Sequence, residues 1–147
     1  MFHKLEKHTA RASVLVVSSL WLGLIVTTPL FDWNWGYDFF SVICHQDSER
    51  SWHIDGRALA VCIRCTSIYA GFLVAIFVGT KPNKCLLISS IILTALEFLI
   101  AQFLIDLAVA RSITGLMLGF ASAGCVIEAI EQLTTKVKLE RSYLEKL

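Results

Sequence analysis

Charge is scarce in this chain of 147 residues. Only 17% of the residues are Asp, Glu, Lys or Arg, and the formal net charge is +1. Proteins that bind nucleic acid carry a basic patch or stripe, and this chain has no surplus of positive charge to form one. The composition therefore argues against a nucleic-acid partner.

Internal repeats, low-complexity runs and polar linkers are also missing. Because linkers of that kind mark domain boundaries, we expect residues 1–147 to form a single domain. Hydrophobic residues make up 56% of the chain, and the mean hydropathy is +0.66. Both values are high for a soluble domain and indicate an integral membrane protein, with the lipid bilayer as its main partner.

Four hydrophobic runs are long enough to cross a bilayer as helices. A hydrocarbon core of about 30 Å requires roughly 20 residues at helical rise. The predicted spans are residues 12–31, 58–80, 85–105 and 112–133. The predicted fold is therefore an all-α bundle of four transmembrane helices.

The positions of Lys and Arg predict the orientation, because cytoplasmic loops are enriched in them. Nine of the 13 lie before the first span, between the second and third, or after the fourth. The other four lie toward the opposite side, and they are Arg50, Arg57, Arg64 and Arg111. We therefore expect a multi-pass protein of the cell (inner) membrane with both termini cytoplasmic and residues 32–57 on the outer face.

The outer loop is rich in aromatic side chains, including Trp33, Trp35 and Trp52. Such rings favour the boundary between lipid and water. We expect residues 35–44 to form a short helix or re-entrant turn in that interface, before the second span.

Small residues recur every four positions in two spans. They are Gly71, Ala75 and Gly79 in the second span, and Gly115, Gly119 and Ala123 in the fourth. Small side chains let helix backbones approach closely, so the pattern predicts a contact between these two spans. The short connection from Asp106 to Arg111 makes the third and fourth spans antiparallel neighbours.

Cysteines dominate the start of the second span. On a helix, Cys62 and Cys65 would share one face, with Cβ atoms about 5–6 Å apart. That geometry suits two thiolates on one metal ion, and it also suits a reversible disulfide. Cys44 and His45 in the outer loop would complete a Cys3His set, the composition of a closed zinc site.

Other candidate ligands have weaker claims. His53 is a fifth candidate in the outer loop. Cys85 and Cys125 stand alone near the cytoplasmic side, and we interpret them as ordinary cysteines of apolar helices. Tyr69 extends the face of Cys62 and Cys65 one turn deeper.

Two intramembrane charges form a second candidate site. By helical rise, Arg64 lies about 9 Å below the outer end of its span and Glu97 about 12 Å below the outer end of the third. The matching depths predict an ion pair, the usual way in which such charges are tolerated. Asp106 and Arg111 are interpreted as a solvated or capping pair at the outer turn.

Several of these residues together resemble a known family. The motifs are Cys44-His45-Gln46, Glu49-Arg50-Ser51, Gly56, Cys62-x-Arg64-Cys65-Thr66 and Tyr69-x-Gly71, followed by Glu97, Gln102, Arg111, Thr114 and Gly115. The pattern resembles the signature of small bacterial and archaeal membrane proteins grouped as domain of unknown function 2085. Ser67 stands where that family commonly has glycine, and Glu97 where it commonly has aspartate. The resemblance implies a topology and a list of residues, but no activity.

Three functional hypotheses follow. In the first, Cys44, His45, Cys62 and Cys65 bind a metal, zinc or another transition metal. In the second, the chain is a thiol-disulfide oxidoreductase linked to quinone, with Arg64, Tyr69 and Glu97 near the cofactor, although Cys44 lacks the partner that a second redox pair requires. In the third, it is a non-catalytic accessory subunit or small permeation module, with a membrane-protein partner or a second copy of itself.

The predicted orientation can be tested by cysteine-accessibility labelling of a cysteine-depleted variant. New cysteines at Asn34 and Trp52 should react with an impermeant reagent in intact cells, whereas one at Asn83 should react only after lysis. Labelling in the opposite sense would place residues 32–57 in the cytoplasm.

Overall fold

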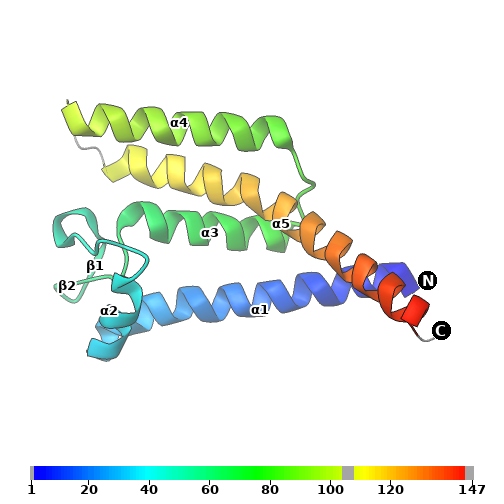
Figure 1. Ribbon diagram of the computed structural model, residues 1–147. Coiled ribbons are helices and arrows are strands. Elements are labelled where there is room, and N and C mark those ends of the chain that lie inside the picture. The colour runs from blue at the N-terminus through cyan, green and yellow to red at the C-terminus, as the bar shows by residue number, and fades with distance from the viewer. Residues whose placement is uncertain (1, 104–107, 145–147) are drawn as a thin grey trace.

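Four long helices make up most of the structure. The computed structural model describes residues 2–103 and 108–144 (Figure 1). The long helices are α1 (Phe2–Leu30), α3 (Ile63–Val78), α4 (Lys84–Phe103) and α5 (Ala108–Leu144). The shorter elements between α1 and α3 are helix α2 (Asn34–Ser41), a 3-10 turn (Ser48–Arg50) and strands β1 (His53–Ile54) and β2 (Arg57–Ala58).

The short elements gather at one end of the bundle. In Figure 1, α2 and the two strands lie at the left, while the first turns of α1 and the last turns of α5 lie together at the right. Of the short helix or re-entrant turn expected over residues 35–44, the structure has the helix, α2, which begins one residue earlier and ends at Ser41. The segment between α1 and α3, residues 31–62, is called the outer segment below.

The apolar helices agree with a membrane protein but not with four spans of equal length. Three stretches are long and apolar enough to cross a membrane: residues 9–30, 84–101 and 108–137. Helix α3 is apolar but has only 16 residues, about 24 Å at helical rise. The second predicted span, residues 58–80, is therefore too long at its start, because Arg57 and Ala58 form β2 and the helix begins at Ile63.

Helix α3 packs most extensively against α5, as the small residues predicted. A Cβ on Gly71 would overlap the backbone of Leu116, and one on Gly119 would overlap the backbone of Ile68. Glycine is required at both positions because backbone atoms cannot move aside as flexible side chains can. Helix α4 packs beside α5 as an antiparallel neighbour, and residues 104–107 between them lie outside the described part of the chain.

A sharp turn at the other end joins α3 to α4. Helix α3 ends at Gly79, whose φ of 77° is left-handed, a conformation that glycine adopts without a steric penalty. The side chain of Asn83 then accepts hydrogen bonds from the backbone N–H groups of Cys85 and Leu86. An asparagine in this position caps the start of α4.

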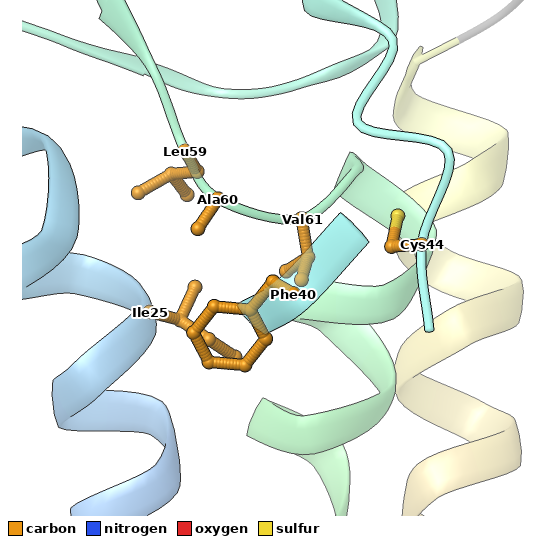
Figure 2. Packing of buried hydrophobic residues seen from close by; sticks show 6 residues of the cluster. All are labelled: Ile25, Phe40, Cys44, Leu59, Ala60 and Val61. Carbon is orange, nitrogen blue, oxygen red and sulfur yellow. The ribbon is translucent and has the colours of Figure 1, made fainter. Parts of the chain in front are cut away.

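The outer segment has a hydrophobic core of its own. Figure 2 shows Phe40 of α2 facing Ile25 of α1, with the extended residues Leu59, Ala60 and Val61 packed beside them. Cys44 lies at the edge of this cluster, near the first turn of α3. The cluster therefore attaches the outer segment to the ends of α1 and α3.

Side chains satisfy the backbone of the outer segment where regular structure does not. The Gln46 amide donates hydrogen bonds to the carbonyls of Tyr37 (2.6 Å) and Ala60 (2.9 Å). The Tyr37 hydroxyl donates to the carbonyl of Ala58 at 2.7 Å. Partners of this kind are what irregular backbone needs wherever water is excluded.

The hairpin of β1 and β2 was not predicted. Its two-residue loop is Asp55-Gly56, with φ values of 50° and 76°. Positive φ at both loop positions defines a type I′ turn, and an Asp-Gly dipeptide is a strong signal for it. The Asp-Gly signal is present in the sequence, but the strands that it joins are only two residues long and have no pattern of their own.

The contact between α3 and α5 predicts opposite effects for two Gly-to-Ala substitutions. Gly119→Ala should destabilise the protein by about 1–3 kcal/mol, because the added methyl group forces the two backbones apart. Gly23→Ala is the matched control: that position in α1 has no atom within 4 Å of the added Cβ, so alanine should be neutral or stabilising. Unfolding in detergent, followed by circular dichroism, measures both. Equal stability of the two variants would contradict the packing.

Candidate metal centre

Three cysteines from the outer segment and the start of α3 form one cluster. The sulfur atoms of Cys44, Cys62 and Cys65 all lie within 4.8 Å of one another. Cys44 is buried, while Cys62 and Cys65 are half-buried. None of the three forms a disulfide.

Local structure brings the thiols together. The sequence predicted Cys62 within the helix. The residue instead lies immediately before it, in an extended conformation with φ −65° and ψ 162°. Cys65 is in the first turn of α3. The backbone N–H of Cys62 donates a hydrogen bond to Sγ of Cys44 at 3.2 Å, which ties the loop after α2 to the helix start.

The surroundings favour a thiolate at Cys62. The neighbouring Cys65 thiol lowers the pKa of the Cys62 thiol by hydrogen bonding, while burial acts in the opposite direction. Backbone N–H groups of Cys65 and Arg64 at the start of α3 and the Cys44 thiol lower the pKa further. Thiolate is the form of cysteine that binds metals and attacks disulfides.

The histidines are not part of the thiol cluster. His45 is exposed, and its ring nitrogens lie outside the group of clustered sulfurs, although the residue lines the adjoining cavity. His53 is exposed on β1. Cys85 is exposed and Cys125 half-buried, and both stand apart from the three clustered cysteines.

A cavity of about 340 Å³ opens beside the thiols, and it is called the thiol cavity below. Its polar lining consists of the three cysteines with His45, Asp47, Arg50, Arg64 and Arg111. Its apolar lining comes from Ile43, Phe98 and Ala101, so α4 forms one wall. This volume is at the lower end of the range for small-molecule pockets.

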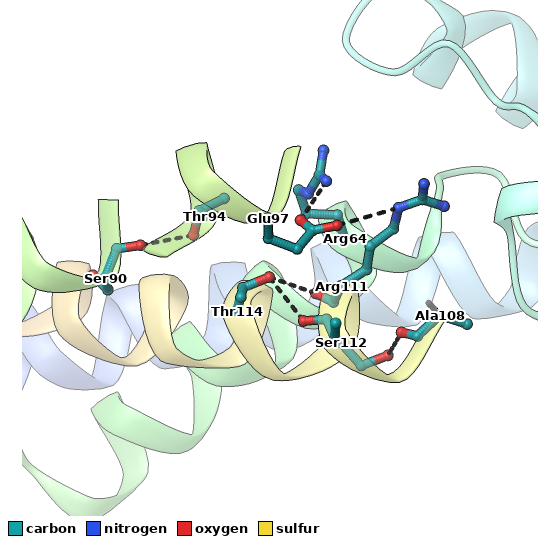
Figure 3. A network of polar contacts seen from close by, with 9 residues as sticks. Arg64, Ser90, Thr94, Glu97, Ala108, Arg111, Ser112 and Thr114 are labelled. Carbon is teal, nitrogen blue, oxygen red and sulfur yellow. Dashed lines mark hydrogen bonds and ion pairs between the residues drawn. The ribbon is translucent and has the colours of Figure 1, made fainter. Parts of the chain in front are cut away.

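Glu97 pairs with two arginines at the edge of this cavity. Its Oε2 atom lies 2.5 Å from Nη2 of Arg64, and its Oε1 atom lies 3.7 Å from Nε of Arg111. Figure 3 shows the carboxylate of Glu97 between the two guanidinium groups. The Arg64 to Glu97 pair is thus present as predicted from the matching depths.

The environment of Arg111 differs from the solvated pair with Asp106 that was expected from the sequence. The residue is 5% exposed and faces Glu97 across α4 and α5. Its predicted partner Asp106 and the side chain of Gln102 lie outside the residues that the structure describes. Arg111 was missed as a site residue because its place at the end of a span suggested a solvated turn.

Tyr69 is placed away from the two charged candidates. It packs edge-on against Trp21 of α1, with ring centroids 6.0 Å apart. Both rings line a separate apolar cavity between α1 and α3. The three residues expected near a cofactor, Arg64, Tyr69 and Glu97, therefore do not line one cavity in the described structure.

Helices of membrane-spanning length, an outer segment whose backbone is satisfied by side chains, and a partly buried cluster of three thiols together characterise an integral membrane protein. The chain belongs to the family described as predicted membrane protein (DUF2085), whose match covers residues 44–125. That range contains the three clustered cysteines, both partners of Glu97 and the contact between α3 and α5.

A similar protein is known from an archaeon. The uncharacterized protein MJ1492 of Methanocaldococcus jannaschii is 39% identical over 70 residues, which is 42% of this chain and 45% of that protein. The matched segment thus spans less than half of the relative's length. No solved structure matches the chain significantly.

The charge network predicts strong coupling between Arg64 and Glu97. Arg64→Gln or Glu97→Gln should each destabilise the protein, because a charge with little exposure loses its partner. The double variant should be less destabilised than the sum, with a coupling energy of about 1–3 kcal/mol from unfolding in detergent.

The exposed pair of Arg57 and Asp32 is the matched control for this cycle. Nη1 of Arg57 lies 3.2 Å from Oδ1 of Asp32, and their side chains are 48% and 64% exposed. An exposed pair should show coupling below about 1 kcal/mol. A coupling energy between Arg64 and Glu97 that is no larger than that of the control pair would mean that the buried ion pair does not form.

Proposed function

We propose that this protein is a metal-binding membrane protein in which Cys44, Cys62 and Cys65 hold one transition-metal ion, zinc being the best fit. The observation that carries the proposal is the clustering of three sulfurs within 4.8 Å of one another. With zinc–sulfur bonds of about 2.3 Å, sulfurs in a tetrahedral site lie about 3.8 Å apart. Small side-chain rotations would suffice to reach that separation.

Electrostatics around the cluster supports the same ligand set. Arg50, Arg64 and Arg111 line the thiol cavity with Asp47, and Glu97 pairs with two of these arginines. Three positive and two negative groups leave one surplus positive charge. Three thiolates on a divalent ion carry one net negative charge, so the complex and its surroundings would be neutral together. Neutrality matters here because uncompensated charge in a low-dielectric environment is costly.

The fourth position of a tetrahedral site is open to His45 or to a donor that enters the cavity. His45 follows Cys44 directly and lines the same cavity. With His45 bound, the site has the Cys3His composition of closed structural zinc sites. Without it, the site would keep the open position that catalytic zinc sites use.

The proposed setting is the cell (inner) membrane, with four crossings, both termini cytoplasmic and the thiol cavity at the outer face. Basic residues gather at the end where α1 begins and α5 ends, and exposed Trp33, Trp35 and Trp52 gather at the other. Helix α3 alone is short, but the outer segment prolongs it with backbone that Gln46 and Tyr37 satisfy. Residues 1–147 would then act as one domain.

Thiol-disulfide exchange is the second candidate function, and one observation favours it. Cys62 and Cys65 begin a helix, and its N–H groups contribute to the lowered pKa of the Cys62 thiol. A pair of this kind can attack disulfides through a mixed disulfide intermediate. A quinone would be the electron acceptor in the membrane.

Metal content should depend on the three clustered cysteines and on no other. Cys44→Ser, Cys62→Ser and Cys65→Ser should each lose most of the bound zinc, because removing one thiolate greatly weakens such a site. Cys85→Ser and Cys125→Ser are the matched controls and should keep it. Elemental analysis of purified, monodisperse protein after zinc loading gives the metal per chain.

The same set of proteins separates the alternatives. Loss of zinc in His45→Ala would identify the fourth ligand, whereas full retention would leave that position to a donor from the cavity. Mixed disulfides trapped in Cys62→Ser or Cys65→Ser, with no zinc in the wild type, would favour thiol exchange. If zinc is absent and no adduct forms, both chemical proposals fail.

A further inference from the structure

Arg64 lies where two cavities adjoin. The first is the thiol cavity. The second, of about 430 Å³, runs along α4 and is called the α4 groove, lined by Arg64, Ile91, Thr94, Ala95, Phe98, Leu99 and Leu118. Because Arg64 and Phe98 line both, the two form one path from the outer end of the bundle toward its middle.

The chemistry changes along this path. Arg50, Arg64 and Arg111 line the outer part together with Asp47, whose Oδ2 atom lies 3.3 Å from Nε of Arg50, so positive charge is in surplus there. Among the described residues that line the α4 groove, Arg64 alone is charged. On α4, the lining extends from Ala101 at the outer end to Ile91, about 15 Å at helical rise. A positive pocket that continues into an apolar groove matches a molecule with an anionic head and a hydrocarbon chain.

One hydrogen-bond donor of Arg64 is unsatisfied within the described part of the chain. Its Nη2 atom pairs with Glu97, and its guanidinium carbon lies 5.4 Å from the centroid of the Phe98 ring. Its Nε atom, however, is buried without a hydrogen-bond partner among the residues of the described structure. A buried donor of this kind is costly unless a ligand or water satisfies it.

We propose that the thiol cavity and the α4 groove together bind one membrane lipid with an anionic phosphate headgroup. The phosphate lies between Arg64 and Arg50, and one acyl chain follows α4 past Leu99 and Ala95. Guanidinium groups suit phosphate because they donate several hydrogen bonds in a planar fork. This site needs none of the three cysteines as ligands, so it stands independently of the proposed metal.

The path from the arginines to the groove has the orientation of a lipid in the leaflet nearest the arginines. Exposed Trp33, Trp35 and Trp52 lie at the end of the molecule where the arginines line the cavity. Tryptophan marks the level of lipid headgroups. The headgroup would then lie at that level, and the chain would point toward the middle of the bilayer as in a free lipid.

Native mass spectrometry of the full chain in detergent tests the headgroup. Phosphatidylglycerol and phosphatidylcholine with identical acyl chains are added in equal amounts. The wild type should retain phosphatidylglycerol with a preference of about tenfold, and Arg50→Gln should lose most of that preference. Arg57→Gln, which removes an arginine of the outer segment that does not line the cavity, should retain it. Equal retention of both lipids by the wild type would overturn the proposal.

A second pair of variants tests the groove. Leu99 lines it and Leu96 does not, and both are on α4 with similar exposure, 54% and 50%. Leu99→Trp should lower the amount of bound phosphatidylglycerol several-fold, because the indole fills the groove, whereas Leu96→Trp should leave it unchanged. Equal binding by the two variants would exclude the acyl chain from the groove.

Displacement of the lipid by equimolar glycerol phosphate would show a site for free phosphate and would also overturn the proposal.

Discussion

The close contact between α3 and α5 is the constraint on which the rest of the site depends. Gly71, Gly115 and Gly119 let the two backbones approach until a methyl group would no longer fit. This approach brings the start of α3, with Cys62 and Arg64, beside the start of α5 with Arg111. Helix α4, which packs on α5, then presents Glu97 to both arginines. Three glycines on two helices thus position charges that come from three helices.

A second constraint is that polar groups near lipid must be satisfied by the protein itself. Glu97 is shared between Arg64 and Arg111, and Gln46 bridges two carbonyls of the outer segment. Gln46 belongs to the Cys-His-Gln motif, yet its amide supports the backbone rather than the thiol cluster. The cysteines are held together because the segments that carry them are held in this way.

The proposed metal and the proposed lipid would share one cavity wall. The thiols lie on the side of α3 and the loop after α2, and the groove continues along α4 on the other side of Arg64. The lipid phosphate is proposed to lie between Arg64 and Arg50, and both arginines also line the cavity beside the proposed metal ligands.

The sequence by itself determined the helical membrane class, the contact between two glycine-bearing helices, the pair of Arg64 and Glu97 and the residues of the cysteine motif. These follow from local composition and helical periodicity, which a chain carries residue by residue. It did not determine that Cys62 precedes the helix, that Arg111 joins Glu97, or that the ring of His45 lies outside the group of clustered sulfurs. The positions of Cys62 and His45 depend on how the outer segment folds back on α1 and α3 through contacts such as Ile25 with Phe40. The contact of Arg111 with Glu97 depends on how α4 packs beside α5. Only the tertiary structure decides them, because distances between residues far apart in the chain have no period in the sequence.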